Sequence, residues 1–516
     1  MPQLPAFPDF LRRLGSSRTG GPPVRPRSRL HRHRFLVAAP VVLLVAAGVY
    51  VSEFWKPCGD GLHSVGSPHV CVGLNLESGP MRDDDPLADL EGLIAQHNAQ
   101  VAGDFKTIVV LENMTPDPDI DTTPMQFVRH EIEGALTAAW PTDRPANFKV
   151  LLANFGSNAQ HWQVVVDEIL AASASQRIMA VAGLGVSLDN TRKAAAALSR
   201  HGIATIGATV TADNVNTDVD NTRIKDFFRV GPTNSDEAHA AGNYVKKHGK
   251  QRVMLVADTN ESDGYAATLA SAFQEQPGVQ VRYTKKYDSL SGQPVGTTRD
   301  QYLQKLFAGM HSDICTAQPD VIYFAGRGVD LRSFVTALSH DGACQQLSSV
   351  TVISGDDTSI LVGAPLPLSG DIGVELLYTG LAYPGQWDLF SQDPAHPAYK
   401  KNYNHFIDEF SAHGFSQTDL RDGAAMIEHD AVATAVKAAE ENPSTHPKSI
   451  TNFLSNIDCN SAVPGASGFI AFDQATGNQL NKAMPILQIM ANGQLGQVDL
   501  VWSRGHPLDT SMSCSS

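Results

Sequence analysis

Residues with the chemistry of a catalytic centre occur in this sequence, but their spacing completes no known catalytic motif. Gly183 and Gly185 form a Gly-x-Gly pair, yet the third glycine of a dinucleotide-binding loop is missing. His130 and Glu131 begin like a zinc-protease helix, but its second histidine does not follow. Neither a GxxxxGK(S/T) phosphate loop nor a Gly-x-Ser-x-Gly turn occurs. We therefore expect no catalytic residues, cofactor or metal, with a scattered Ser/His/Asp site among the 18 histidines as the alternative.

The six cysteines favour disulfides over metal or redox chemistry. No two of them have the CxxC spacing of a zinc site or a thioredoxin-like motif. Disulfides are typical of proteins in an oxidising compartment. Six cysteines allow fifteen connectivities. We favour the pairing of cysteines that are close in sequence: Cys58 with Cys71, Cys315 with Cys344, and Cys459 with Cys514.

The first 55 residues predict a membrane anchor. Residues 1–34 contain eight arginines and one acid, and residues 35–51 are then free of charge. This run is longer than the signal-peptide core of roughly 7–15 residues. It is slightly shorter than the roughly 20 residues that span a bilayer, unless Phe54 and Trp55 lie in the interface. A cleaved signal peptide with small residues at Val45–Gly48 is the alternative. A buried helix of a soluble domain is another, but the arginine-rich flank argues against it.

Charge predicts where the body of the chain lies and which partners it avoids. The arginines before the apolar run indicate a cytoplasmic tail, and thus a large extracellular or periplasmic part. The tail has a net charge of +7, so the rest of the chain is −22, given −15 for the whole. A body this acidic is repelled by phosphate backbones, which excludes nucleic acid as a partner.

Beyond the anchor, short β-branched runs alternate with longer helical patterns. Such βαβ repetition predicts parallel sheets covered by helices on both faces. A first amphipathic helix, with Leu87, Leu90, Leu93 and Ile94 on one face, precedes these units. Breaks near residues 229–234, 380–386 and 470–480 suggest three crossings between two lobes. The expected strands are 107–111, 149–153, 178–183, 204–207, 252–257, 280–287, 321–325 and 350–354, and the expected helices are 125–139, 161–172, 191–200, 235–247, 265–274, 299–310 and 330–339.

Several segments, read in order, resemble type I periplasmic binding proteins of the leucine/isoleucine/valine-binding family, the receptors of branched-chain amino-acid ABC transporters. The resemblance spans roughly residues 105–501 as a diffuse pattern, and the order and spacing of the segments make it specific. The segments are IMAVAGLGVSLDNTRKAAAALSRHGIATIGATVTAD, FFRVGPTNSDEAHAAGNYV, QRVMLVADTNESDGYAATLASAF, PDVIYFAGRGVDLRSFVTAL, VTVISGDDTS, DGAAMIEHDAVATAVKAA and SGFIAFDQATGNQ.

The resemblance implies an α/β fold of two interleaved, doubly wound parallel-sheet lobes that close over a ligand; in this chain the fold would follow the N-terminal transmembrane helix predicted above from the charge-free run. Open α/β sheets bind ligands at the carboxyl ends of their strands, which places the site similarly. The implied organisation is a basic tail (1–34), a transmembrane signal-anchor (35–55), a disulfide-clasped linker and helix (56–103), lobe 1 (104–232 and 381–475), lobe 2 (233–380 and 476–505) and a C-terminal tail (506–516).

Carried over by position, the resemblance also implies ligand contacts. Ser187, Thr209 and Thr211 would bind a ligand carboxylate from the first lobe. In the second lobe, Tyr265 would supply the aromatic contact, and Asp356, with Asp357 as a competitor, would meet an ammonium group. The hydroxyls could equally cap helices, the tyrosine could pack in a core, and the aspartates could belong to turns.

Two departures from the family pattern bear on the ligand. Ala266 follows Tyr265 where the family usually has glycine, and Arg327 stands where relatives often carry an aromatic residue. A guanidinium in the cleft would favour a carboxylate or phosphate, although Arg327 could also be a solvated loop cation. The sequence thus predicts a receptor for a small polar solute, an amino acid or a related carboxylate or amide, that serves an ABC importer and its permease. The alternative is a sensing or interaction module whose lobe closure signals to a partner.

Overall fold

The computed structural model describes residues 58–508, apart from 60, 67–69, 83, 143–146, 291–292, 295, 341, 343, 345, 391–396 and 443–446. The predicted basic tail, the predicted membrane anchor and Cys514 lie outside the described residues. Among the helices within that range, none is long and apolar enough to cross a membrane.

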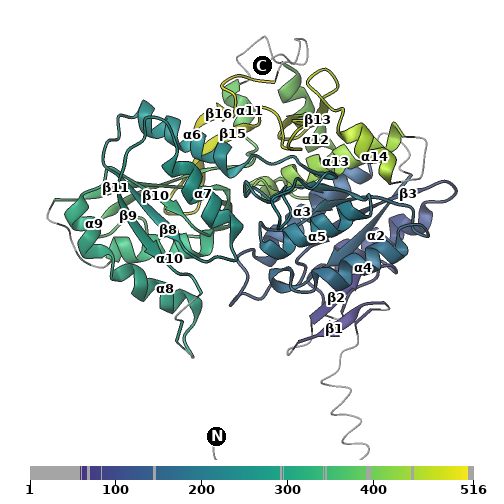
Figure 1. Cartoon of the computed structure of the whole chain (residues 1–516), viewed down its shortest axis with the longest axis horizontal. Coiled ribbons are helices and arrows are strands. Elements are labelled where there is room, and N and C mark those ends of the chain that lie inside the picture. Colours follow the sequence, from purple (N-terminus) through teal and green to yellow (C-terminus); the bar gives the residue numbers. More distant parts are fainter. Residues whose placement is uncertain are drawn as a thin grey trace, which may run out of the picture. The chain divides into compact units, whose positions relative to one another are not determined.

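A seven-stranded sheet forms the centre of the first lobe (Figure 1). Its core strand β3 is buried along nearly its whole length, with Ile108 and Val110 in one hydrophobic cluster and Val109 and Leu111 in another. Alternate residues of a strand point to opposite faces, so this run needs helices on both sides of the sheet. In order across the sheet the strands are β1 (His63–Val65), β2 (Val70–Leu74), β4 (Phe148–Asn154), β3 (Lys106–Glu112), β5 (Ile178–Gly183), β6 (Ala204–Gly207) and β7 (Phe227–Arg229).

Helices cover both faces of this first sheet. One cluster holds the apolar faces of α2, α3 and α12–α14, and the other holds those of α4 and α5. In α2, Leu90 and Ile94 are buried as predicted, but Leu93 is 43% exposed. The helices are α2 (Ala88–Gln100), α3 (Met125–Ala139), α4 (Trp162–Ala172), α5 (Asp189–Arg200), α12 (Pro397–Ala412), α13 (Ala424–Glu440) and α14 (Lys448–Leu454).

The second lobe repeats this plan around another seven-stranded sheet, at the left of Figure 1. Along β10, Ile322 and Phe324 face one cluster while Val321, Tyr323 and Ala325 face the other. The strands, in order, are β16 (Leu495–Trp502), β15 (Ala483–Ile489), β12 (Gly373–Thr379), β11 (Ser349–Ser354), β10 (Val321–Ala325), β8 (Val253–Asp258) and β9 (Val281–Tyr287), and the helices are α6 (Asn234–Lys247), α7 (Gly264–Gln274), α8 (Arg299–Ala308), α9 (His311–Ala317) and α10 (Gly328–His340).

The prediction of wholly parallel sheets is wrong at the sheet edges. In the first lobe, β2 pairs antiparallel with β4 and β1 antiparallel with β2. The segment expected to be only a linker and a helix therefore also supplies two edge strands. In the second lobe, β15 pairs antiparallel with both β12 and β16. These strands reach the sheet edges by hairpins or lobe crossings, whereas parallel neighbours need a helical crossover.

Three chain crossings interleave the lobes. They run from β7 to α6, from β12 to α11 (Gln386–Phe390), and from the hairpin β13 (Val463–Gly465) and β14 (Gly468–Ile470) to β15. Arg229, at the first crossing, is fully buried and donates hydrogen bonds to the carbonyls of Val210 and Ala212 and to Asn478 Oδ1. One guanidinium thus ties together chain segments that lie about 250 residues apart in sequence.

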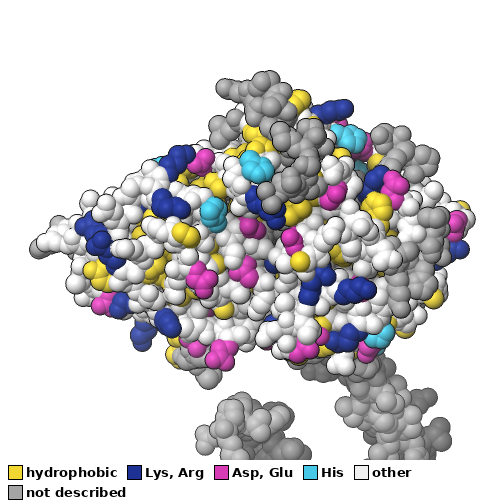
Figure 2. Space-filling view, turned by 45° about the horizontal axis from the view of Figure 1, so that its top comes forward, with side chains coloured by type: hydrophobic (Ala, Val, Ile, Leu, Met, Phe, Trp, Pro, Cys, Tyr) yellow, Lys and Arg dark blue, Asp and Glu magenta, His cyan; other side chains and the backbone are white. Residues whose placement is uncertain are grey.

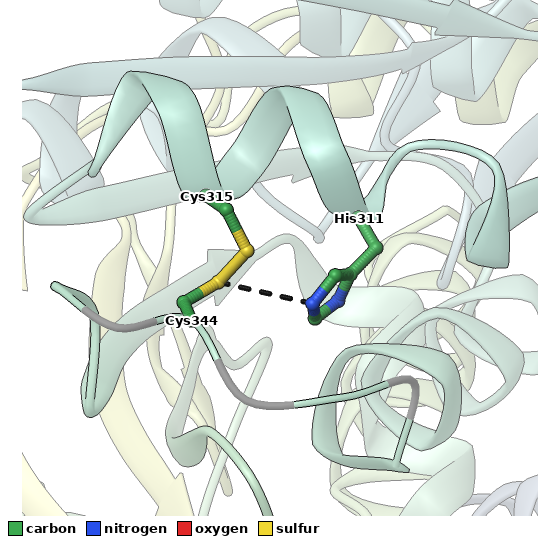
Figure 3. Close-up of side chains that lie close together, drawn as sticks. All are labelled: His311, Cys315 and Cys344. Carbon is green, nitrogen blue, oxygen red and sulfur yellow. Dashed lines mark hydrogen bonds between the residues drawn. A yellow bond between two sulfur atoms is a disulfide. The ribbon is translucent and has the colours of Figure 1, made fainter.

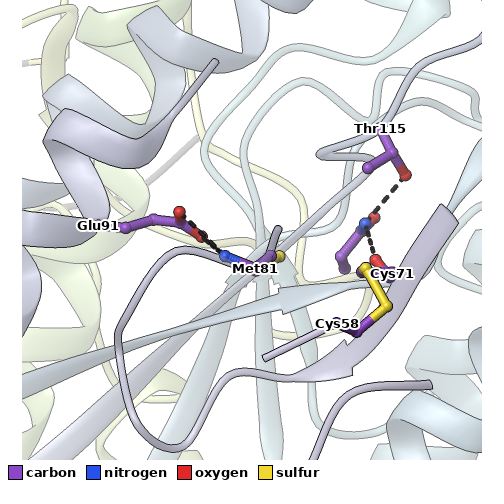
Figure 4. Close-up of a disulfide and its surroundings, with 6 residues drawn as sticks. Cys58, Cys71, Met81, Glu91 and Thr115 are labelled. Atoms are coloured by element: carbon purple, nitrogen blue, oxygen red, sulfur yellow. Dashed lines mark hydrogen bonds between the residues drawn. A yellow bond between two sulfur atoms is a disulfide. The ribbon is translucent and has the colours of Figure 1, made fainter. Parts of the chain in front are cut away.

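Two of the predicted disulfides are confirmed. Cys58 pairs with Cys71 of β2, close to the Met81 amide that donates to Glu91 (Figure 4). Cys315 of α9 pairs with Cys344, whose Sγ lies 3.8 Å from His311 Nε2 (Figure 3). Cys459 is also disulfide-bonded.

The surface carries charges of both signs. On the face drawn in Figure 2, acidic and basic side chains are interspersed, and neither kind gathers into a patch. This face offers no basic stripe of the kind that binds nucleic acid.

Candidate functional site: the cavity between the lobes

A cavity lies between the two lobes, and both contribute to its wall. The first lobe provides mainly strand ends and one face of α3, and the second provides loops that follow β8, β10 and β11. Six of its eight charged lining residues are acidic. The lining includes Glu112, Asn113, Asp121, Phe127, Glu131, Phe155, Gly185 and Thr209 from the first lobe, and Asn260, Asp263, Tyr265, Arg299, Arg327, Asp356, Asp357 and Ile360 from the second.

Strand ends position the first-lobe wall. Glu112 is the last residue of β3, and Gly185 and Thr209 follow β5 and β6 at the same edge of the sheet. The amide of Gly185 donates to Glu112 Oε1 at 2.9 Å. The Thr209 hydroxyl lies 3.1 Å from Glu131 Oε1 and 3.0 Å from the carbonyl of Gly185, so it serves as a donor within this wall.

A buried ion-pair network forms the second-lobe wall. Asp263 caps α7 by accepting from the amides of Tyr265 and Ala266. Arg327 binds both oxygens of Asp263, at 2.7 and 2.8 Å, and donates to Asp357 at 3.1 Å. Its guanidinium carbon lies 4.6 Å from the centre of the Tyr265 ring. Burial alone would lower the pKa of Arg327, but the two carboxylates raise it above its usual value.

This network corrects the expectation for Arg327. The guanidinium lines the cavity, but two protein carboxylates already neutralise it. Arg299, the other lining arginine, is paired with Asp330 at 2.8 Å. Among the described lining residues, acids therefore outnumber cations, and the cations have partners. The cavity favours a ligand with positive charge or hydrogen-bond donors over a bare anion.

Asp356 stands beside another buried acid. It belongs to the short helix η2 (Asp356–Leu361), and its amide donates to Glu237 Oε2 at 2.8 Å. The same Glu237 oxygen accepts from the Thr379 hydroxyl at 2.9 Å. Burial, followed by repulsion from Asp357, raises the pKa of Asp356 to about 7. Asp356 can thus change its charge near neutral pH, and a cationic group in the cavity would favour the ionised form.

Direct contacts join the lobes around the cavity. The Thr211 hydroxyl of the first lobe donates to Asp356 Oδ1 of the second at 3.2 Å. Arg327 reaches back to the carbonyl of Ser187 at 3.3 Å. Ser187 Oγ itself accepts from the amide of Ala212. Ser187 and Thr211 are both buried and are not among the lining residues, so here they join the lobes and hold a loop in place.

The structure therefore brings five of the seven expected ligand residues to the cavity: Thr209, Tyr265, Arg327, Asp356 and Asp357. The Tyr265 hydroxyl accepts from the amide of Asp357 at 3.3 Å. Sequence reasoning missed Glu112 and Glu131. Glu112 directly follows an expected strand, so the strand-end rule could have found it, whereas Glu131 lies inside a helix and gave no such signal.

Comparison with known proteins fits this geometry. A family model described as "Periplasmic binding protein" matches residues 170–494. The chain belongs to this family. The match runs from the end of α4 to just before β16, so it covers the later strands of the first lobe, the segments that return to it, and the second lobe apart from β16. Among curated proteins, the sequence comparison finds no match.

Solved structures of the family share the fold. A leucine-binding protein, LivK, from Thermotoga maritima aligns with 18% identity and a TM-score of 0.54, over 77% of this chain and 98% of that one. An ABC transporter substrate-binding protein from Desulfitobacterium hafniense, in complex with Leu, aligns with 17% identity and a TM-score of 0.54, over 77% and 100%. A solute-binding protein from R. palustris, in complex with 4-hydroxybenzoate, aligns with 13% identity and a TM-score of 0.56, over 77% and 97%.

Proposed function

We propose that this protein binds a small polar solute, an amino acid or a related carboxylate or amide, between its lobes and delivers it to an ABC importer. The observation that carries the proposal is the cavity walled by both lobes, which Tyr265 of α7 and Asp356 and Asp357 of η2 line from the second lobe. Because acidic residues outnumber basic ones in the cavity lining, the solute should carry an ammonium group or several hydrogen-bond donors. Asp356 is the acid that would face that group.

A thermal-shift screen of amino acids, small carboxylates, amides and amines tests this proposal. We expect the strongest stabilisation from compounds with an ammonium group. The proposal fails if no compound of these classes stabilises the protein. Calorimetry on the best compound should then show that Asp356→Asn weakens binding by about tenfold or more, because a charge-assisted hydrogen bond contributes about 1.5–3 kcal/mol.

Asp320→Asn is a matched control for Asp356→Asn. Asp320 lies just before β10, at the opposite end of the sheet from the cavity, and it pairs with Arg252. This variant should bind the compound like the parent protein. If Asp356→Asn also binds like the parent, the proposed role of Asp356 is wrong.

We further propose that residues 35–55 anchor the protein in the membrane, with the binding part outside the cytoplasm and the permease of the importer as its partner. The support is the charge-free run and its arginine-rich flank. Protease added to intact cells should remove the chain beyond Trp55 and leave an epitope tag on residues 1–34 intact. Complete protection of the whole chain would contradict this topology.

A further inference from the structure

Three buried carboxylates from distant parts of the sequence meet in the first lobe. They are Glu112 at the end of β3, Glu131 in α3 and Glu428 in α13, which we call the glutamate triad. One carboxylate oxygen of each lies within 4.8 Å of the others. The three side chains are between 0 and 1% exposed.

Close packing of α3 and α13 brings two of the three together. A side chain at Gly134 would come within 2.0 Å of the Ala425 carbonyl, so the helices touch backbone to backbone at this point. Glu131 lies one helical turn before Gly134, and Glu428 lies one turn after Ala425. Glycine at this crossing therefore sets the short distance between the two carboxylates.

Among the residues that the structure describes, the triad has few hydrogen-bond donors and no cation. Glu112 accepts from the Gly185 amide and Glu131 from the Thr209 hydroxyl. Both oxygens of Glu428 lack a hydrogen-bond partner among the described residues. Burial, and then repulsion within the triad, raises the pKa of all three, and no lysine, arginine or histidine contributes to these shifts. Buried carboxylates normally have a paired charge or bind a metal.

We propose that the glutamate triad binds a divalent cation, with Ca²⁺ preferred. Hard cations take carboxylate and carbonyl oxygens as ligands. The three carboxylate oxygens, all within 4.8 Å of one another, are close enough to bind one ion. Ca²⁺ is the better candidate because it accepts carboxylates in flexible geometry, whereas Mg²⁺ dehydrates reluctantly and usually keeps several waters, and this triad is buried. The unpartnered Glu428 carboxylate would complete its interactions on the ion.

The cation has a route to the triad, and its charge would alter the cavity. Glu112, Glu131, Gly185 and Thr209 all line the space between the lobes. An ion that enters with a solute, or before it, would therefore reach two of the three carboxylates. The ion would offset the negative charge of the first-lobe wall. A solute carboxylate could then dock on a wall that otherwise repels it.

Calorimetry with CaCl₂ on the full chain, treated with EDTA and then freed of it, tests the proposal. We expect one site per chain that is saturated at millimolar calcium, and weaker binding of MgCl₂. Glu428→Gln and Glu131→Gln should each weaken calcium binding at least tenfold, because each removes a ligand charge. Glu133→Gln is the matched control, since this buried acid lies on the same helix as Glu131 but pairs with Arg129. The calcium affinity of this variant should equal that of the parent protein.

Several outcomes would overturn the proposal. Parent protein that gives no heat with calcium, or triad variants that bind calcium like the parent, would do so. If Glu428→Gln does not fold, the parent protein and Glu131→Gln still decide the question. Solute binding is measured in a separate titration with EDTA present. A triad that does not bind calcium would therefore not contradict the proposed function.

Discussion

The two walls of the cavity hold buried acids in opposite ways. In the second lobe, Asp263 and Asp357 share the guanidinium of Arg327, and each also accepts hydrogen bonds from backbone amides. In the first lobe, the described part of the chain gives the glutamate triad backbone amides at Glu112 and one hydroxyl at Glu131, but no cation. The Arg327 network is therefore neutralised within the protein, whereas the triad, and Asp356 of the second wall, need protons or an added cation to reduce their charge.

Acids with a paired cation contribute mainly to stability, whereas acids without one can respond to a ligand. A buried ion pair with its hydrogen bonds satisfied keeps one charge state over a wide pH range and contributes a rigid surface. A cluster of like charges changes its state when a proton or ion arrives, so it can respond to what enters the cavity. The Arg327 network can thus orient a solute, and the acids without a cation can adjust the field in which the solute binds.

Breaking the Arg327 network should have the largest effect. Arg327→Met leaves Asp263 and Asp357 buried without their cation, which should lower the free energy of unfolding by about 3–5 kcal/mol. Urea unfolding measures the loss. Arg252→Met is the control, because Arg252 pairs with Asp320 at the surface and is 47% exposed. Arg252→Met should lower the free energy of unfolding by less than about 1 kcal/mol. Equal losses in the two variants would contradict the contrast between buried and exposed pairs.

The raised pKa of Asp356 predicts how stability depends on pH. The folded pKa is about 7 and the ordinary value is 3.8, so the folded protein holds this proton more tightly than the unfolded chain. Its contribution to stability is full below about pH 4 and is lost as the pH rises through about 7. Asp356→Asn should remove roughly 1–3 kcal/mol of the stability difference between pH 5 and pH 8.

Chemical denaturation at pH 5 and pH 8 checks this prediction. Asp119→Asn, at an exposed carboxyl, should keep the pH dependence of the parent. A parent protein that is more stable at pH 8 than at pH 5, with the same slope in Asp356→Asn, would show that Asp356 is ionised throughout.

The unpartnered acid of the first wall predicts a gain in stability. With EDTA present, Glu428→Gln should raise the free energy of unfolding by about 1 kcal/mol, because it relieves repulsion and removes no hydrogen bond. Glu409→Gln provides the contrast: Glu409 is buried but accepts from the amide and hydroxyl of Thr142, so this variant should lose stability. A loss in Glu428→Gln under the same conditions would mean that its carboxylate has a partner after all.

The hydrogen bond between the walls should have the smallest effect. Thr211→Val removes the donor to Asp356 and should lower the free energy of unfolding by about 0.5–1.5 kcal/mol. The affinity for a solute that binds the closed lobes should fall several-fold. Calorimetry measures the affinity. Thr336→Val, at a partly exposed threonine that donates within its own helix, should leave affinity unchanged. Unchanged affinity in Thr211→Val would mean that this contact does not help to close the lobes.

Much of the fold could be predicted from local sequence. All eight expected strands form, and β5, β6 and β10 have the predicted bounds, because a strand buried on both faces is a continuous apolar run. The antiparallel edge strands were missed. Strands β1 and β16 are partly exposed and carry polar residues, so no apolar run marks them.

The site divides along the same line. From the sequence by itself, the family resemblance, in agreement with the rule that ligands bind at strand ends, placed Thr209, Tyr265, Asp356 and Asp357 at one cavity. Only the tertiary structure decided which charged side chains at the cavity have a partner of opposite charge. Arg327 is not a free cation, because it is paired with Asp263, which lies 64 residues earlier. Glu428 meets Glu112 across more than 300 residues of chain. Burial and the field of neighbouring charges arise from contacts between distant segments, and no local pattern of residue types encodes them.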